Sequence, residues 1–441
     1  MSLLEKLSMI KVYCKNVKKS ICLYGSGRID LFIVIALAVL IVTPLIFNSS
    51  FRINAEVKQV NLFLSPRFEE LFGSEITETL LREFEERNPD IRVRTAAAPP
   101  DILIFDEGEF SAIAAAGALS KLDPYAGYEP EDKEEPFRPF ADDQMAVPLV
   151  SFMDLLFYNI DILTAAGFDR PPKTRQEFLA CAAAVSGENA GGETAGGENA
   201  GAALSLSQAD RQALSRDIFS WIWAAGGDFL SLEDSSQRPS VNNRAIIADL
   251  NFLGALNGDK ALAARAFETT GDQRLEEFAD GKIAMMIAST SAIPFLREKM
   301  GDGAFGITTV PSSGGAGKYG ICLSGIYAGL SANCEYPVEA RSFLVFLAEK
   351  SPLFCAHLKA VPGMISDLIP GDYVKGDPFY SKAWDIFESS AIVKGFSGKP
   401  GAEEYEGAFL EELRAFFETG RTAQETTAAI QRRWDDINLR P

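Results

Sequence analysis

Apolar runs alternate with amphipathic stretches along most of the chain after residue 56. Residues 101–105 (DILIF) are almost wholly apolar, as expected for a parallel strand that is covered on both faces. Pro89 and Gly117 end the two amphipathic stretches nearby. In this part the pattern predicts strands at 57–64, 91–94 and 101–105 and helices at 77–88 and 110–116. Strands that alternate with helices predict an α/β fold with doubly wound, mostly parallel sheets.

The alternation continues to the C-terminus. Helices are predicted at 175–185, 208–225, 244–256, 273–279, 338–349, 409–417 and 423–437, and strands at 282–288 and 304–309, followed by a Gly-rich turn at 312–318. Residues 187–201 repeat as GENAG, GETAG and GENAG. That composition buries too little apolar surface to order a chain, so a disordered surface loop is expected there.

One apolar stretch near the N-terminus has the character of a membrane segment. Residues 31–47 (LFIVIALAVLIVTPLIF) carry no charge and follow a basic leader, residues 1–30. A length of about 17 residues lies at the short end for a transmembrane helix. The basic side should stay in the cytoplasm and direct the bulk of the chain outward. We therefore expect a single-pass membrane anchor with the rest of the chain extracytoplasmic. A cleaved signal peptide is the alternative, but its basic region would be unusually long and no convincing A-x-A cleavage site follows the apolar run.

Composition narrows the classes of partner and chemistry. The chain has 441 residues and a formal net charge of −19, which leaves no basic footprint for nucleic acid. Six Cys form no C-x-x-C pair, so zinc or redox chemistry is not indicated, and a bridge such as Cys322–Cys334 is an alternative to buried thiols. The single His, His357, lies in a helix-like run. No hydrolase or Walker-type motif is present, and no cofactor or metal is expected.

Several segments, taken in order, resemble the family 1 extracellular solute-binding proteins, the maltose-binding-like group of ABC importers. The most specific block runs from Val147-Pro148 through Phe157-Tyr158-Asn159 to Pro171-Pro172-Lys173-Thr174 and Glu177-Phe178. Other matching segments are Pro100-Asp101-Ile102-Leu103, Leu122-Asp123-Pro124, Ala225-Gly226-Gly227-Asp228 and Gly281-Lys282 with Ala284-Met285-Met286. Together they cover about residues 58–437. Two departures stand out: a helix is missing between Arg94 and Pro100, and Arg175 replaces the family's Trp.

The resemblance implies a periplasmic-binding-protein-like fold, two lobes joined by a hinge. The first lobe would hold residues 57–147 and 312–350, and the second 148–311 and 351–441. It also implies a function: the extracytoplasmic component of an ABC importer, which captures a small solute, a sugar being favoured, between the lobes and delivers it to the permease subunits. Closure would require contacts from both lobes, since only a ligand that prefers the closed state shifts the population.

Matched positions give eight candidate ligand-binding residues. Aromatic faces suit the C–H surfaces of sugars, and polar groups at the rim suit their hydroxyls. For five of them, a purely structural role is the competing interpretation: Phe105, Glu109, Phe152, Trp223 and Trp384. Trp221 and Trp223 lie on opposite sides of one helix, so at most one can face the cleft. The candidates are Ser65, Phe105, Glu109, Phe152, Trp223, Thr290, Ser291 and Trp384.

Two other classes of function compete with transport. A membrane-anchored sensor could keep the same clamp and signal to a membrane partner. An enzyme is the third, and the missing motifs speak against it. Ser291 stands where sugar binders often carry a Trp, so a small polar solute fits the sequence as well as an oligosaccharide does.

Overall fold

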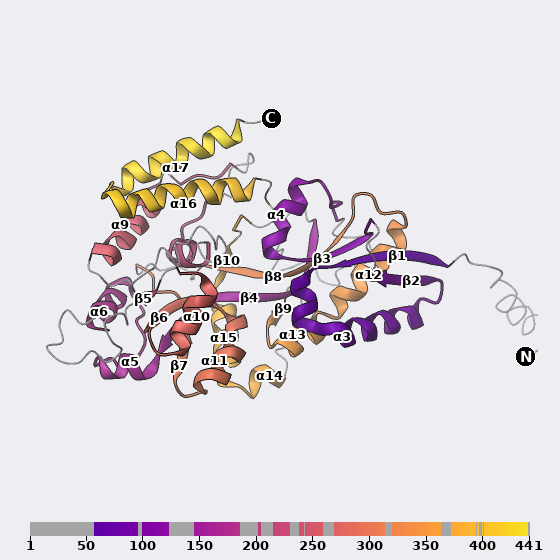
Figure 1. Ribbon diagram of the computed structural model, residues 1–441, viewed down its shortest axis with the longest axis horizontal. Coiled ribbons are helices and arrows are strands. Elements are labelled where there is room, and N and C mark those ends of the chain that lie inside the picture. The colour runs from indigo at the N-terminus through magenta and orange to yellow at the C-terminus, as the bar shows by residue number, and fades with distance from the viewer. Residues whose placement is uncertain are drawn as a thin grey trace, which may run out of the picture. The chain divides into compact units, whose positions relative to one another are not determined.

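The structure is a computed structural model, and it describes residues 57–95, 99–122, 145–185, 202–203, 215–229, 238–241, 243–258, 269–313, 320–362, 372–393, 395–396, 399 and 401–439 (Figure 1). The expected leader, the membrane segment 31–47 and the repeat 187–201 lie outside these residues. Within them, no helix is both long and apolar enough to cross a bilayer. All elements below belong to one unit, Lys58–Pro441.

The unit begins with three strands in the predicted order. Strand β1 (Lys58–Leu64) pairs in parallel with β2 (Ile91–Thr95) and β3 (Ile102–Asp106). Helix α3 (Pro66–Arg87) starts eleven residues before the predicted helix, because the Ser65 side chain accepts a hydrogen bond from the Phe68 N–H at 3.2 Å and caps it. Gly73 interrupts the helix at φ 68°, which masks this early start in the sequence pattern.

Two long strands run through the middle of the sheet. Strand β4 (Ala146–Asn159) and strand β8 (Gly320–Leu330) pair with each other antiparallel, in the order β2-β1-β3-β8-β4-β6-β5 (Figure 1). β8 is also antiparallel to β3, and β4 to β6 (Met285–Ser289) and β7 (Phe305–Thr308). The predicted mostly parallel sheet is therefore wrong here. Only consecutive strands joined by a crossover helix must be parallel, and no such crossover leads into β8.

The buried side chains show where the unit divides. Along β4, Val150 and Phe152 belong to a core with α3, whereas Met153 and Leu155 belong to a core with β6 and β7. Along β8, Ile321 packs with the latter core and Ile326 with the former. The change falls within both strands, later in the chain than the division expected from the sequence.

The division expected at residue 350 also differs from the packing. Phe354 of helix α13 (Ser351–Leu358) lies in the core of the first three strands, 5.0 Å from the ring of Phe72 and 6.1 Å from that of Phe68. We use "first lobe" for the part around β1–β3 and "second lobe" for the part around β6 and β7. Helix α13 packs with the first lobe, because Phe354 completes the aromatic cluster on α3.

Helices cover both faces of the first lobe. α3 and α12 (Pro337–Glu349) share one face, where Phe84 and Phe343 meet edge to face at 4.9 Å. α4 (Glu107–Ala115) covers the other, and its Phe110 packs on Phe105 and Tyr327. Ile102 and Ile104 point to the first face and Leu103 and Phe105 to the second, which explains why β3 is apolar throughout.

The second lobe has the same layered plan. One face carries α5 (Ile160–Ala165), α6 (Arg175–Val185), the turn Ser215–Phe219 with α8 (Ser220–Ala224), α9 (Arg244–Gly258), α16 (Ala402–Thr419) and α17 (Ala423–Asn438). The other carries α10 (Gly271–Ala279), α11 (Ile293–Met300) and α15 (Pro378–Ser389). Short elements complete the fold: β5 (Ala202–Ala203), β9 (Val361–Pro362), β10 (Ala391–Val393) and α14 (Asp372–Lys375).

Arg175, which departs from the family pattern, is buried in the second lobe. Its guanidinium donates to Asp249 at 2.6 Å and to the carbonyl of Trp221 at 2.7 Å, and it lies over the ring of Phe252. Burial raises the pKa of Asp249 even though the arginine beside it acts in the opposite direction. The ion pair is buried, so neither partner can be lost alone without leaving a buried charge.

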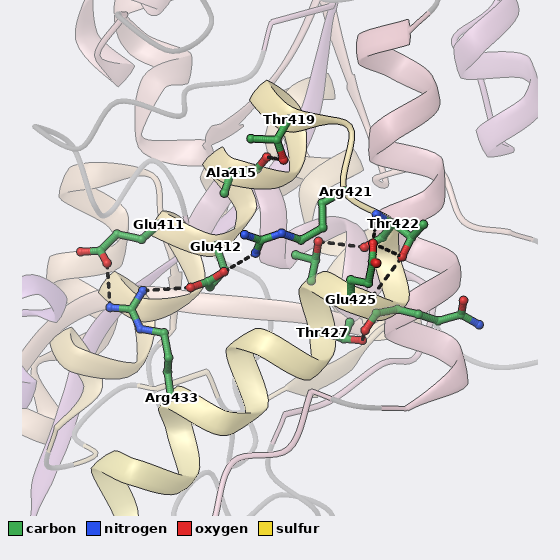
Figure 2. A network of polar contacts seen from close by, with 11 residues as sticks. Glu411, Glu412, Ala415, Thr419, Arg421, Thr422, Glu425, Thr427 and Arg433 are labelled. Carbon is green, nitrogen blue, oxygen red and sulfur yellow. Dashed lines mark hydrogen bonds and ion pairs between the residues drawn. The ribbon is translucent and has the colours of Figure 1, made fainter.

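Helices α16 and α17 form a hairpin that is fixed by charges (Figure 2). Glu412 accepts from Arg421 at 2.5 Å and from Arg433 at 3.4 Å, and Arg433 also pairs with Glu411 at 2.6 Å. Thr422 and Glu425 form a capping box at the start of α17. The hairpin holds the first turns of α16 at a defined position in the second lobe.

The four described cysteines, Cys181, Cys322, Cys334 and Cys355, are free thiols, so no Cys322–Cys334 bridge is formed.

Candidate functional site

A cavity of about 440 Å³ lies where β4 and β8 pass from one lobe to the other. Its wall combines first-lobe residues of α3 and the start of α4 with second-lobe residues of α8 and α16. The two lobes also meet directly beside it, because the Ser111 hydroxyl of α4 donates to the carbonyl of Phe396 at 3.3 Å. A molecule in the cavity would therefore contact both lobes.

Three aromatic residues line the cavity: Phe152, Trp223 and Phe396. Phe152 reaches the cavity from β4 just before the strand enters the second lobe. Phe396 is held from behind, where its ring is stacked on Phe229 at 5.6 Å and on Tyr405 at 5.8 Å. Rings that are packed on one side and face a cavity on the other provide rigid platforms for a ligand.

Trp223 is 97% buried in the fold, with 3% of its surface exposed, and packs edge to face on Phe219. Its indole N–H has no acceptor among the described residues. Gly395 passes close to its ring: a Cβ on Gly395 would lie 3.4 Å from the indole and 3.2 Å from the Cys322 sulfur. The buried donor at the wall requires an acceptor, because an indole N–H in an apolar environment is costly to leave unpaired.

Five carboxylates reach the same cavity: Asp106, Glu107, Asp154, Glu403 and Glu406. Glu107 is the first residue of α4, and the Tyr327 hydroxyl donates a hydrogen bond to it. Burial raises the pKa of Glu107 to about 8, and the charges of Glu406, Asp106 and Asp154 act in the same direction. Glu107 therefore holds its proton at neutral pH.

Four serines and one thiol supply the remaining polar groups of the wall. Ser289 accepts from the backbone N–H of Ser291 at 3.2 Å, and the two hydroxyls lie 3.0 Å apart. Ser111 and Ser324 line the wall as well. Burial and the neighbouring carboxylates raise the pKa of the Cys322 thiol well above its usual range, so this thiol is unreactive. In the part of the chain that the structure describes, no group of His, Cys, Asp or Glu could hold a metal ion.

Three of the eight residues predicted from the sequence line the cavity: Phe152, Trp223 and Ser291. Trp221, on the other side of the same helix, packs on Phe178 and Phe252 instead. Of the two tryptophans, Trp223 lines the cavity and Trp221 does not.

Five predicted residues do not line the cavity. Ser65 caps α3, and Phe105 is wholly buried behind α4. Glu109 is used in the capping box of α4, where it accepts from the backbone N–H of Asp106 at 3.2 Å. The Thr290 hydroxyl accepts from the backbone of Met153 at 3.1 Å. Trp384 packs in the core of the second lobe and donates to Glu388 at 2.8 Å. In each case local packing or capping employs the side chain.

Sequence reasoning missed the carboxylates. Asp154 had a signal: it is a lone charge inside the apolar run of β4, FMDLLF. Glu107 lies midway between Phe105 and Glu109, which were both predicted as ligand-binding residues. Glu107 lines the cavity, and these two neighbours do not. Glu403, Glu406 and Phe396 come from the C-terminal region and reach the cavity only through tertiary packing.

An α/β unit of two layered lobes, with a solute-sized cavity where two strands cross between them, defines the class of two-lobed ligand-binding proteins. Residues 67–353 match the model of a protein family that is described as bacterial extracellular solute-binding protein. The chain belongs to this family, which confirms the resemblance seen in the sequence. Membership of this family makes it a solute-binding protein and not an enzyme.

Individual relatives agree with this assignment. A probable ABC transporter-binding protein of Deinococcus radiodurans is 24% identical over 252 residues, 56% of this chain and 57% of the relative, so the match spans a little over half of that protein. The cyclic alpha-maltosyl-1,6-maltose binding protein of Arthrobacter globiformis superposes with a TM-score of 0.68 at 17% identity, covering 86% of this chain and 98% of the other.

Two further solved structures are similar. The GacH receptor of Streptomyces glaucescens, solved unliganded and with acarbose, has a TM-score of 0.64 at 17% identity, covering 87% of this chain and 98% of its own. UgpB of Mycobacterium tuberculosis, in complex with glycerophosphocholine, has a TM-score of 0.63 at 20% identity and covers 86% of this chain and 98% of its own. At these identities the likeness shows a periplasmic-binding-protein-like fold.

Proposed function

We propose that the protein captures a small solute in the cavity between its lobes and delivers it to the permease subunits of an ABC importer, with a sugar as the favoured class. The observation that carries the proposal is the wall of the cavity, where Phe152, Trp223 and Phe396 combine with serines and carboxylates from both lobes. Aromatic faces and hydroxyl-binding groups are what a sugar requires.

The relatives support the same class. Solutes named for similar proteins include acarbose, maltose and a cyclic maltosyl-maltose, together with the glycerophosphocholine of UgpB. The Deinococcus relative supports the importer as the partner. The lobes would close by a hinge where β4 and β8 cross, since the ligand contacts both sides and so favours the closed state.

The extracytoplasmic placement is proposed from the family and from the apolar segment 31–47 behind its basic leader. That segment would act as a single-pass anchor to the membrane. N-terminal sequencing of the protein isolated from membranes tests it: a chain that starts at residue 1 is expected. A start near residue 50 would show that the segment is cleaved.

A thermal-shift screen against sugars, polyols, amino acids and phosphodiesters tests the function. A ligand that binds only the folded protein stabilises it by RT ln(1 + [L]/Kd), so weak ligands register at millimolar concentrations. We expect sugars or sugar-like polyols to raise the melting temperature, and the Phe152→Leu variant to show a smaller shift at the same ligand concentration. No shift with any solute class would contradict the proposal.

A further inference from the structure

Two residues of the cavity wall each bury a polar atom that has no hydrogen-bond partner among the described residues. One atom is the carboxyl oxygen Oε2 of Glu107, at the start of α4 in the first lobe, and the other is the indole nitrogen of Trp223, in α8 of the second lobe. A buried polar group that makes no hydrogen bond is costly. Each lobe therefore contributes one polar atom whose hydrogen bond is left to a ligand.

The carboxyl group of Glu107 is a hydrogen-bond donor at neutral pH. The Tyr327 hydroxyl donates to this carboxyl group, and Tyr327 is itself buried. Burial favours the uncharged carboxyl and raises the pKa of Glu107 to about 8. Because the tyrosine donates to one oxygen and the proton stays on the carboxyl group, the other oxygen, Oε2, carries an O–H that can donate.

Other titratable and charged groups surround Glu107 on several elements. Tyr327 and Cys322 lie on β8, and burial raises the pKa of both side chains well above their usual ranges. Three acidic neighbours act on Glu107 in the same direction as burial does. The charged residues that line the cavity with Glu107 are Asp106, Asp154, Glu403, Glu406 and Arg67. The ionisation of Glu107 is thus separated in pH from that of its two neighbours on β8.

Trp223 is the second donor, and its orientation is fixed by the protein. Only 3% of its surface is exposed, and its ring packs edge to face on Phe219. Gly395, also at the wall, lies beside the edge of the indole that is close to the nitrogen: a Cβ on Gly395 would lie 3.4 Å from Cη2 and 3.5 Å from Cζ2. The missing side chain leaves space beside this edge. An indole N–H can only donate, so its partner must be an acceptor.

We propose that the cavity binds an uncharged, hydroxylated solute whose oxygens accept hydrogen bonds from the Glu107 carboxyl of the first lobe and from the Trp223 indole of the second. The two bonds form together only when both lobes contact the solute, so they favour the closed state. The inference rests on the proposed solute-binding function and deepens it, because the uncharged form of Glu107 becomes a condition of binding. An ionised carboxylate can accept but cannot donate, so affinity falls as the pH rises through the pKa of Glu107.

The pH dependence of sugar binding tests the role of Glu107. Glucose, maltose and cellobiose are titrated calorimetrically at pH 6, 7, 8 and 9, each in two buffers of different ionisation enthalpy. With a pKa of about 8, about nine-tenths of the protein keeps the Glu107 proton at pH 7 and about one-tenth at pH 9. Kd should therefore rise about tenfold between these values, and each sugar bound at pH 9 should take up close to one proton from the buffer. A constant or rising affinity would overturn the inference.

Two matched pairs of variants assign the effect to the two donors. Glu107→Gln keeps a donor but cannot ionise, so its affinity should be the same at pH 7 and pH 9. Glu69→Gln is its control and should keep the wild-type pH dependence, because Glu69 is exposed on α3 and does not line the cavity. Trp223→Phe keeps a ring without the N–H and should weaken binding about fivefold. Trp221→Phe removes the same group on the opposite side of α8, away from the cavity, and should change affinity less than about twofold.

Each result supports or overturns the assignment. A thermal melt of each variant confirms that it is folded, and the wild-type pH series decides the inference even where a variant is not. If Glu107→Gln keeps the wild-type pH dependence, or if Trp221→Phe weakens binding as much as Trp223→Phe does, the donors are wrongly assigned. If none of the three sugars binds at millimolar concentrations, the inference fails. The proposed function then stands where another solute of the broader screen binds, and fails with the inference where none does.

Discussion

Replacing Glu107 with Gln should stabilise the protein, and increasingly so as the pH rises. The folded environment raises the pKa of this carboxyl from its usual 4.5 to about 8 through burial and through its acidic neighbours. Its contribution to stability is thus fully present below the unfolded pKa and is lost as the pH rises through the folded pKa. Gln cannot ionise and keeps an oxygen that can accept the hydrogen bond from Tyr327.

The size of the effect follows from the two pKa values. Each pH unit between them costs the wild-type protein about 1.4 kcal/mol relative to the variant. At pH 7 the Gln variant should therefore be more stable by about 3 kcal/mol, and near pH 4.5 the difference should vanish. Solvent reaches part of the cavity wall and screens these charges, so the free-energy difference of about 3 kcal/mol is an upper value.

Urea unfolding followed by tryptophan fluorescence at pH 5, 6, 7 and 8 measures the difference directly. Glu69→Gln serves as the control for the loss of one carboxylate, because Glu69 is exposed on α3 and does not line the cavity. A difference for Glu107→Gln that stays constant across the series, or a variant less stable than wild type at pH 8, would refute the account of the acidic wall.

Three further predictions concern two aromatic residues, a buried ion pair and a glycine that lies against a neighbouring strand. Phe152→Leu should weaken solute binding several-fold at a stability cost below about 1.5 kcal/mol, whereas Trp384→Ala should cost about 3 kcal/mol of stability and leave affinity unchanged, as titrations and urea melts would show. Asp249→Leu should destabilise the fold by about 3–5 kcal/mol, because it leaves a buried arginine without its partner; an unchanged urea midpoint would contradict this. Gly325→Ala would place a Cβ 2.1 Å from a β4 carbonyl and should lower stability by about 1–3 kcal/mol, while Gly303→Ala, with nothing within 4 Å, should be near neutral in the same melts.

Much of the framework could be predicted from periodicity. Helix α6 has the predicted bounds, and β1, β2, α9, α12 and α17 lie within two residues of theirs, because each has a clear apolar face or a cap. Strands β4 and β8 were not predicted. Gly320, Gly325 and Gly329 weaken the strand signal of β8, and the charge at Asp154 breaks the apolar run of β4. These two strands carry the cavity, so the largest gap in the prediction fell at the site.

The candidate site shows the same limit. Aromatic residues on matched segments, Phe152 and Trp223, could be chosen from the sequence, and the structure places both at the wall. Choosing among neighbours such as Phe105, Glu107 and Glu109 requires knowing which one the helix cap employs. That depends on hydrogen bonds and not on residue type. The convergence of α16 on α4 is a tertiary contact with no local signal.

A crystal structure of the protein with the tightest ligand of the screen tests the central claim most directly. The account predicts that the solute lies between Phe152 and Trp223, with contacts to α4 from the first lobe and to α16 from the second. A solute bound outside this cavity, or held by one lobe alone, would contradict it.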